Sequence, residues 1–432
     1  MDPVVVGSLA IVASLVLLAV RVPVAVALGL TSVIGYLFIS SPFGVWYTLG
    51  TTALQIGTEY TFSVIPLFVL MGALAVQSGM TDRLFSASTA LFGRARGSEA
   101  MATIAASAAL GAVSGSSLAT TATMSRVAGV DLLKRGYSPS LVGGAIAAGG
   151  TLGILIPPSV VIVIYALITG QSVAHLFAAG LLPGLLLTLL YIAATYIVIH
   201  LRPGSAPPPV LMTANRLKTI LGGWEVVALF SITIGGIYLG WFTPSEAASV
   251  GVALAFVIGF SFGRLTAAGV MASLRETVTT AASLFFVVLG ATFFAYFIIQ
   301  ARVPVMLVEA IEVREIPGIA VILLILAFYL VAGCFLDGIG MMLATVPVFF
   351  PVVVGLGYDP IWFGILVVVA IEVGLITPPI GMNIFVIKGQ LAELGLGAIY
   401  RGVIPYVIAQ IILLALLLAI PGIATFLPDV FF

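Results

Sequence analysis

Two adjacent prolines interrupt each of two otherwise apolar stretches of this sequence. Pro157 and Pro158 lie within GILIPPS, and Pro378 and Pro379 lie within GLITPPIGMN. Proline has no N–H, so it cannot donate a hydrogen bond to the carbonyl four residues earlier in a helix. Each pair therefore leaves carbonyl oxygens without helical partners, and unwound carbonyls at membrane depth are suited to coordinate sodium.

Two glycine-rich segments, GAVSGSS at 111–117 and CFLDGIG at 334–340, offer further oxygen atoms to these breaks. We predict one sodium site in each half of the chain, built from a glycine-rich tip and the freed carbonyls. The candidate ligands of the first site are Ser114, Ser116, Ser117, Gly153, Ile154 and Pro157. The candidate ligands of the second site are Asp337, Gly338, Gly374, Leu375, Thr377 and Pro378.

Acidic side chains make the second half of the chain the more polar one. Asp337 is the only charge between Glu315 and Asp359. A charge at the bilayer centre costs about 2.5 to 3.5 kcal/mol, so we expect Asp337 to act beside a cation. Glu372 is the only charge between Asp359 and Lys388, and it either faces a cavity or takes part in a structural pair.

Helix N-termini add a second kind of site to the breaks. Half-helices that begin after the breaks and at the glycine-rich tips present the positive ends of their dipoles. We therefore expect an anionic substrate, with Ser116, Thr151 and Asn383 as its candidate ligands. An intramembrane enzyme would need a His, Cys or acid pair at depth, and Asp337 with Glu372 is the only plausible pair, so we expect no enzymatic activity.

The composition is that of a polytopic membrane protein. The chain has 432 residues, of which 62% are hydrophobic and only 7% are charged, whereas a soluble domain has about 25% charged residues. The net charge is zero, so nothing indicates nucleic-acid binding. The single Cys334 excludes a disulfide framework and a cysteine metal site.

The sequence predicts an all-α fold with about ten transmembrane helices and two re-entrant helical hairpins. Apolar stretches long enough to span a bilayer lie at 4–20, 23–41, 60–80, 138–169, 181–201, 223–241, 244–263, 274–300, 360–388 and 401–421. The stretches 98–130 and 317–355 are too long for one helix and contain the glycine-rich tips. We interpret them as hairpins that enter and leave on one side, with tips buried in protein.

The two halves of the chain repeat. GYSP at 136–139 is matched by GYDP at 357–360, and the two Pro-Pro segments match at the same offset of 221 residues. That offset also places Ser116 on Asp337. The expected organisation is scaffold helices in 1–59, a first repeat in 60–203, a cytoplasmic linker in 204–222, scaffold helices in 223–273 and a second repeat in 274–425.

The charges beside the hairpins indicate that the repeats are inverted, because cytoplasmic loops have an excess of Lys and Arg. The first hairpin is flanked by Arg83, Arg94 and Arg96 before it and by Arg126, Lys134 and Arg135 after it. The second hairpin is preceded by Glu309, Glu312 and Glu315 as well as by two arginines. The first hairpin is thus predicted to enter from the cytoplasm, the second from the opposite side, and both termini are predicted to be periplasmic.

The segments GAVSGSSLATTATM, GGTLGILIPPS, FLDGIGMM and EVGLITPPIGMN, in this order, resemble the large membrane subunit of TRAP (tripartite ATP-independent periplasmic) transporters. The resemblance covers nearly the whole chain. It implies an elevator-type fold of the ion-transporter superfamily and sodium-coupled import of an organic acid across the bacterial inner membrane.

The resemblance also implies two protein partners. One is a small four-helix membrane subunit, which we expect to be a separate chain, and the other is a periplasmic substrate-binding protein. The further partners expected are Na+, the organic acid and membrane lipid, with no nucleic acid. The alternative is a stand-alone sodium- or proton-coupled dicarboxylate or anion symporter of the same superfamily.

Overall fold

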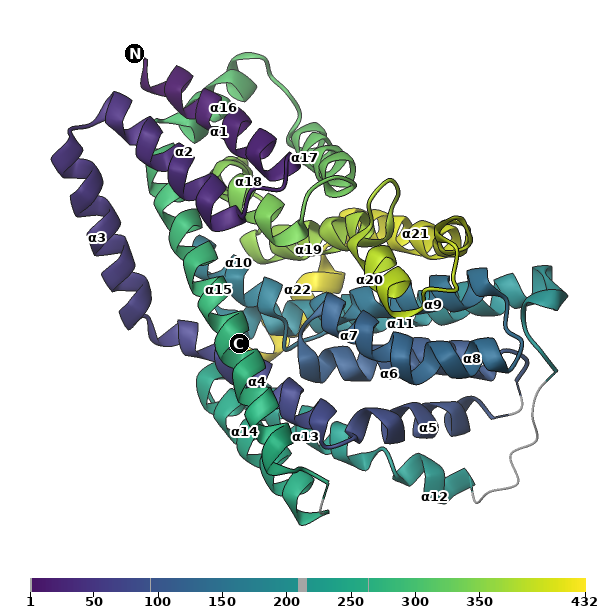
Figure 1. Cartoon of the computed structure of the whole chain (residues 1–432). Helices are drawn as coiled ribbons and strands as arrows, with labels where there is room; N and C mark the ends of the chain where they lie inside the picture. Colours follow the sequence, from purple (N-terminus) through teal and green to yellow (C-terminus); the bar gives the residue numbers. More distant parts are fainter. Residues whose placement is uncertain (1, 94, 209–215, 263) are drawn as a thin grey trace.

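The computed structural model describes residues 2–93, 95–208, 216–262 and 264–432, and every regular element in these ranges is a helix (Figure 1). The chain begins with α1 (Pro3–Ala19), α2 (Val24–Ile39), α3 (Pro42–Thr58) and the short η1 (Tyr60–Ser63). Proline at the start of α1 and α3 is favoured because the first N–H groups of a helix lack partners anyway. The helix α3 was not predicted, because its polar residues, such as Gln55, lower its hydropathy.

The first half continues through the first glycine-rich hairpin and the first broken helix. Its helices are α4 (Val64–Gln77), α5 (Met80–Phe92), α6 (Ser98–Ser114), α7 (Ser117–Met124), the π-helical η2 (Ser125–Gly129), α8 (Val130–Lys134), α9 (Pro139–Leu155), α10 (Val160–Thr169), α11 (Val173–Leu201) and η3 (Pro203–Ser205). The two arms of the hairpin meet at Gly115, whose φ of 63° lies in the left-handed region that glycine tolerates.

The second half has the same order of elements. Three helices lead into it, namely α12 (Arg216–Leu221), α13 (Trp224–Tyr238) and α14 (Pro244–Ser261). The others are α15 (Ala267–Gln300), α16 (Val303–Val313), α17 (Gly318–Gly333), α18 (Gly338–Gly355), α19 (Pro360–Ile376), α20 (Met382–Gln390), α21 (Leu396–Ala419) and α22 (Gly422–Phe431).

Corresponding helices of the two halves begin at nearly constant spacing. The first parts of the broken helices, α9 and α19, have 17 residues each and start at Pro139 and Pro360, which are 221 positions apart. The outgoing hairpin arms start at Ser117 and Gly338, at the same spacing. Side-chain caps repeat as well, since Ser138 accepts from the N–H of the third residue of α9 and Asp359 does the same for α19.

Seven helices among the described residues are long and apolar enough to cross a membrane. They cover Tyr60–Gln77, Pro139–Thr169, Val173–Leu201, Pro244–Ser261, Ala267–Gln300, Gly338–Gly355 and Leu396–Ala419. The stretches predicted at 4–20, 23–41 and 223–241 form apolar helices of 15 to 17 residues, and 360–388 is divided between α19 and α20. The chain is therefore an all-helical, multi-pass membrane protein.

Two helices begin earlier than predicted. The helix expected at 181–201 starts at Val173, and the helix expected at 274–300 starts at Ala267. In each case a hydroxyl residue caps the actual start, with Ser172 accepting from the N–H of His175 and Thr266 accepting from that of Gly269. Such caps satisfy N–H groups that have no partner within the helix, and they were not used in the prediction.

The broken helices form the centre of the molecule. Every residue of α9 from Leu141 to Leu155 and of α19 from Trp362 to Ile376 is buried. In Figure 1 the long α15 runs past this bundle, with α3 on its outer side, while α2 packs on α15 and α1 packs against α2 and α18. Pro157 and Pro158 of the first break are buried, whereas Pro378 and Pro379 of the second break are exposed. The expectation that both tips are buried in protein is wrong for the second one, because Phe335 and Asp337 are exposed.

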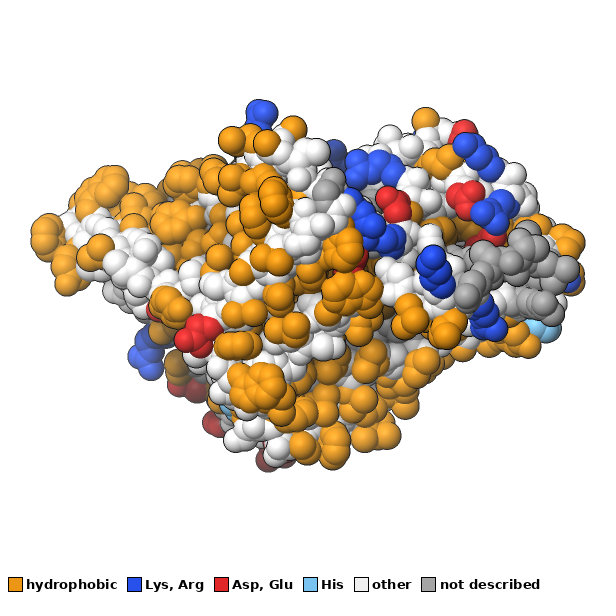
Figure 2. Space-filling view, turned by 90° about the horizontal axis from the view of Figure 1, so that it is seen from below, with side chains coloured by type: hydrophobic (Ala, Val, Ile, Leu, Met, Phe, Trp, Pro, Cys, Tyr) orange, Lys and Arg blue, Asp and Glu red, His pale blue; other side chains and the backbone are white. Residues whose placement is uncertain are grey.

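Basic side chains that were used to predict orientation take part in ion pairs at the rim of the molecule. Arg83 contacts the buried Glu225, which also lies 3.6 Å from Arg264. Arg135 contacts Glu99 at 2.6 Å. Figure 2 shows Lys and Arg gathered on one part of a face that is otherwise mostly hydrophobic. The predicted basic position 94 lies outside the described residues.

Candidate functional site

Each hairpin crosses its broken helix at a pair of glycines. A Cβ atom added to Gly111 of α6 would lie 2.6 Å from the Cα of Gly153 in α9. A Cβ atom added to Gly374 of α19 would lie 2.6 Å from the carbonyl oxygen of Gly333 in α17. Because these distances are too short for any side chain, glycine is required for the hairpins to reach the breaks.

The tips of both hairpins are capped by the two residues that the repeat places in register. The Ser116 hydroxyl accepts from the N–H of Ala119 at 3.4 Å, and a carboxylate oxygen of Asp337 accepts from the N–H of Gly340 at 3.0 Å. The helix after the first break is capped in the same way by Ser159. Three helix N-termini, those of α7, α10 and α18, therefore begin beside the breaks.

A cavity of about 460 Å³ lies where these N-termini meet α4 and α15. The tip residues Ser114 to Ala119 line it, together with Val160 and Val161 at the start of α10 and Asp337 to Ile339 at the start of α18. The opposite wall comes from α4 and from Glu276, Thr280 and Leu284 of α15. The side chains of both hairpin tips thus line one cavity, whereas the sequence had suggested a separate site in each half.

Most of the first predicted ligand set is together at this cavity. Ser114, Ser116, Ser117 and Ile154 line it, whereas Gly153 and Pro157 lie behind its wall. Within the described part of the chain, no hydrogen-bond donor reaches the carbonyl oxygen of Gly153 or Ile154.

Thr120 was not among the predicted ligands, but its hydroxyl lies 2.9 Å from that of Ser114. Its signal is the run of hydroxyl residues in SSLATT, one helical turn after the tip. Thr120 is fully buried, and a Cβ atom on Gly153 would lie 3.0 Å from its hydroxyl oxygen. Thr120 therefore adds a hydroxyl to the first ligand set beside the crossing point.

The second ligand set is arranged differently. Asp337, Gly338 and Leu375 line the cavity, but Gly374, Thr377 and Pro378 do not. The expectation that the Gly374 carbonyl lacks a partner is wrong, because the N–H of Thr377 donates to it at 3.4 Å. The hydroxyl of Thr377 donates back to Val373 at 2.5 Å. Local bonds at the end of α19 thus occupy groups that the sequence analysis assigned to a cation.

Two of the predicted substrate ligands lie behind the cavity wall. Asn383 of α20 is fully buried; its amide nitrogen donates to Ala147 at 3.1 Å and to the hydroxyl of Ser117 at 2.8 Å. Thr151 is also fully buried, and its hydroxyl lies 3.0 Å from that of Tyr191. Ser116 alone of the three lines the cavity. Asn383 links the second half to the first hairpin.

Glu372 meets neither of the expectations stated for it. Its side chain is fully buried in α19 and does not line the cavity. Neither carboxyl oxygen has a hydrogen-bond partner or ion pair among the described residues. Glu372 is therefore part of the interior of the broken-helix unit.

The fold and this site define a multi-pass membrane transporter in which two hairpins and two broken helices surround one cavity. The sequence profile of the family described as "Tripartite ATP-independent periplasmic transporter, DctM component" matches residues 11–423. This chain belongs to that family. It is a transporter permease and not an enzyme.

Two relatives in the family align with this chain over most of their length. The chain is 35% identical over 386 residues to the "C4-dicarboxylate TRAP transporter large permease protein DctM" of Pseudomonas aeruginosa, covering 88% of this chain and 89% of that protein. It is 31% identical to the "Sialic acid TRAP transporter large permease protein SiaM" of Vibrio cholerae, covering 86% and 87%.

A solved structure has a related fold. The Alcanivorax borkumensis YdaH transporter superposes with a TM-score of 0.63 over 88% of this chain and 89% of the YdaH chain, at 16% sequence identity. At that identity the likeness concerns the fold alone.

Proposed function

We propose that this chain is the membrane-embedded permease of a sodium-coupled, binding-protein-dependent transporter that imports an organic acid. The observation that carries the proposal is the single cavity lined by both hairpin tips and flanked by three helix N-termini. Helix N-termini favour anions because their dipoles and free N–H groups point outward. Membership of the family supports the proposal that transport depends on a binding protein.

Sodium is the coupling ion in this proposal. The unpartnered carbonyls of Gly153 and Ile154 lie next to the hydroxyls of the first tip. Carbonyl and hydroxyl oxygens are both ligands that coordinate sodium. In the second half the carboxylate of Asp337 and the carbonyl of Leu375 are the candidates that remain at the cavity. The residues of the first tip fit a sodium ion better than those of the second break, where the Gly374 carbonyl and the Thr377 hydroxyl already have local partners.

The same N-termini and two of the relatives support the proposed substrate class, although other relatives are named for ectoine. The two supporting relatives are named for C4-dicarboxylates and for sialic acid, and both substrates are acids. The 460 Å³ cavity is in the range of small-ligand sites. We therefore assign an organic acid, with Ser116 as a ligand and with Thr151 and Asn383 acting from behind the wall.

An elevator mechanism with inverted repeats is supported by the position of the cavities along α15. The main cavity touches α15 at Glu276, Thr280 and Leu284. A second cavity of about 330 Å³ touches the same helix further along, from Val288 to Ile299. Both lie between α15 and elements of the repeats, so sliding of the broken-helix unit along α15 would carry the hairpin tips from one cavity toward the other.

The partners proposed are those of a three-component system. A periplasmic binding protein would deliver the acid, and a small four-helix membrane subunit, as a separate chain, would complete the membrane part. The location is then the bacterial inner membrane, with both termini on the periplasmic side.

Uptake by proteoliposomes tests the proposal. The chain is reconstituted with the small subunit and the binding protein, and uptake of labelled succinate and N-acetylneuraminate is measured with an inward sodium gradient. We expect uptake of one acid that requires sodium and both partners. Full uptake in sodium-free potassium buffer without a proton gradient would contradict sodium coupling, and uptake by the chain alone would identify a stand-alone symporter.

A further inference from the structure

One basic side chain lines the main cavity without a partner of its own. Three charged residues contribute to the lining, namely Arg126, Glu276 and Asp337, so Arg126 is the only cation there among the described residues. It makes no hydrogen bond or ion pair with any other residue in the described ranges. The nearby Arg83 and Arg135, by contrast, are both paired with acids.

The position of Arg126 relative to the hairpin tip sets what it can bind. It lies in the π-helical turn η2, nine residues after Ser117, which corresponds to about 13 Å along a helix axis. Helical side chains lean toward the N-terminus, so that of Arg126 covers the turn containing Ala122 and Thr123, which also line the cavity. The guanidinium is thus about one to two turns from the N-terminus of α7.

We propose that Arg126 binds the second acidic group of a dicarboxylate whose first carboxylate lies at the N-termini of α7 and α10. This inference rests on the proposed function and gives it a substrate class. A guanidinium binds a carboxylate through two parallel hydrogen bonds. An exposed but unpaired guanidinium inside a cavity is available for such a contact. A C4-dicarboxylate has two carboxylates separated by a short chain, so it suits two anion sites on one hairpin arm.

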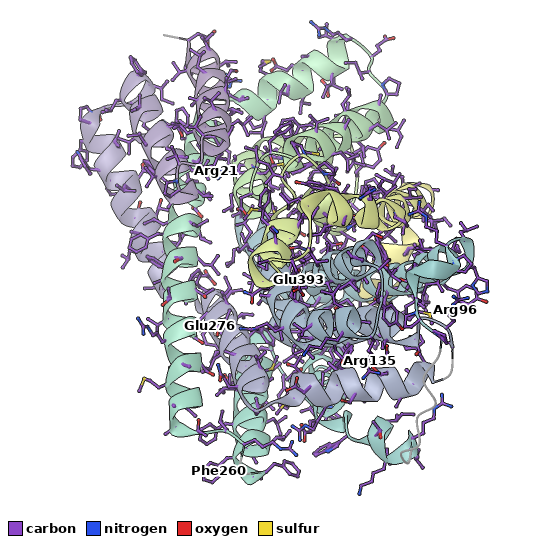
Figure 3. All side chains as sticks on the ribbon, turned by 45° about the vertical axis from the view of Figure 1, so that its right-hand side comes forward. Arg21, Arg96, Arg135, Phe260, Glu276 and Glu393 are labelled. Atoms are coloured by element: carbon purple, nitrogen blue, oxygen red, sulfur yellow. The ribbon has the colours of Figure 1, made fainter. Side chains whose placement is uncertain are left out.

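The opposite wall strengthens the assignment to Arg126. Glu276 on α15 faces the helices of the first repeat across the cavity (Figure 3) and makes no ion pair among the described residues. A second carboxylate near Glu276 would be repelled, whereas near Arg126 it would be attracted. The substrate is therefore oriented along the hairpin arm. Two other roles compete with this one. Arg126 would either help to set the orientation of the chain in the membrane or form an ion pair with Glu276.

Ligand binding to the chain purified together with its small membrane subunit, in lipid nanodiscs, tests the proposal without the binding protein. The probes are succinate and monomethyl succinate, which differ by one negative charge, and affinity is obtained from thermal shifts at a fixed sodium concentration. We expect wild type to prefer succinate. Arg126→Gln should weaken succinate binding by about 10- to 100-fold, the range expected for a hydrogen bond to a charged group. It should change monomethyl succinate binding much less.

Three further variants make the result specific. Arg126→Lys keeps the charge but not the paired geometry, so it should retain part of the preference. Glu276→Gln should tighten succinate binding, because it removes a like charge from the opposite wall. Arg275→Gln is the matched control, since this exposed arginine on α15 does not line the cavity. Its succinate affinity should equal that of wild type.

A labelling experiment covers the case in which Arg126→Gln fails to fold. Arg126→Cys is combined with Cys334→Ser, which leaves a single cysteine, and is labelled with a methanethiosulfonate reagent. Succinate with sodium should slow the labelling. In wild type, the comparison of succinate with its monomethyl ester remains available as an independent measurement.

Several results would overturn the inference. Wild type would bind succinate and its monoester equally, or would not bind succinate. Alternatively, Arg126→Gln would leave succinate affinity unchanged. Equal losses of affinity in Arg126→Gln and Glu276→Gln would indicate a direct ion pair between the two residues. Sodium-dependent uptake of another acid by the complete system would leave the proposed function standing in each case. Absence of any sodium-dependent uptake would instead contradict the proposed function itself.

Discussion

At the scale of single residues, Ser116 and Asp337 have the same structural role as N-caps but differ in charge. Both cap the outgoing arm of a hairpin, and both line the cavity. Only Asp337 adds a negative charge, which is costly at membrane depth unless a cation lies beside it. The two halves therefore offer similar backbone geometry but unequal electrostatic attraction for sodium.

Replacing Asp337→Asn separates charge from capping. Asparagine is as good an N-cap as aspartate, so α18 should keep its start while sodium loses a charged ligand. We expect the sodium concentration for half-maximal uptake to rise about tenfold or more, as for loss of about 1.4 kcal/mol. Ser116→Ala should shift it less. Unchanged sodium dependence in Asp337→Asn, at equal expression, would remove this residue from the site and leave the carbonyls and hydroxyls as ligands.

Asn383 is predicted to matter for stability more than for substrate affinity. Its side chain is fully buried and bonds to Ser117 and Ala147, so Asn383→Ala leaves the buried Ser117 hydroxyl without its partner. An unsatisfied buried polar group costs about 1 to 3 kcal/mol, and the unfolding temperature in detergent should fall. Gln390→Ala, at the exposed end of the same helix, is the control. A normal unfolding temperature with lost substrate binding would instead support a direct ligand role.

At the scale of elements, the glycine crossings decide whether hairpin and broken helix can meet. In both halves the backbones approach so closely that a methyl group would overlap the facing chain. The crossings lie beside the freed carbonyls and the capped tips, so they determine the distance between the two parts of each predicted sodium site. A change at a crossing should therefore affect stability and transport together.

Gly111→Ala and Gly374→Ala test this requirement. Overpacking of a close contact costs about 1 to 3 kcal/mol, so each variant should unfold at a lower temperature and lose uptake. Gly389→Ala in α20 has no atom near its added Cβ and should retain both properties. Wild-type stability and uptake in Gly111→Ala would show that the hairpin does not need this approach.

At the scale of the whole molecule, orientation in the membrane is the feature that the inverted-repeat proposal depends on. Lys134 follows the first hairpin and Glu312 precedes the second, and both side chains are exposed. The charge distribution predicts that they face opposite sides of the membrane. A parallel arrangement would place both on one side.

Cysteine labelling in a Cys334→Ser background measures this directly. Lys134→Cys should react with an impermeant maleimide only from the cytoplasmic side, and Glu312→Cys only from the periplasmic side. Arg216→Cys, within the predicted linker, serves as a second cytoplasmic position. Labelling of both test positions from the same side would contradict inverted repeats and, with them, the elevator proposal.

The amino-acid sequence by itself determined where the chain folds back and where its helices break. Pro157 and Pro378 end α9 and α19 because proline removes a donor and restricts the residue before it. Gly115, with its positive φ, permits the first turn, and the 221-residue offset that placed Ser116 on Asp337 joins two residues with the same capping position. These features are local, so residue types and spacing were sufficient to predict them.

Only the tertiary structure decided which polar side chains face the cavity. Thr151, Asn383 and Glu372 lie behind its wall, while Arg126 lines it. The sequence could not distinguish them, because helices that are buried on all sides have no polar face to indicate a direction. The side that faces the cavity depends on how α9 and α19 rotate against the hairpins, and contacts between residues far apart in the chain determine that rotation.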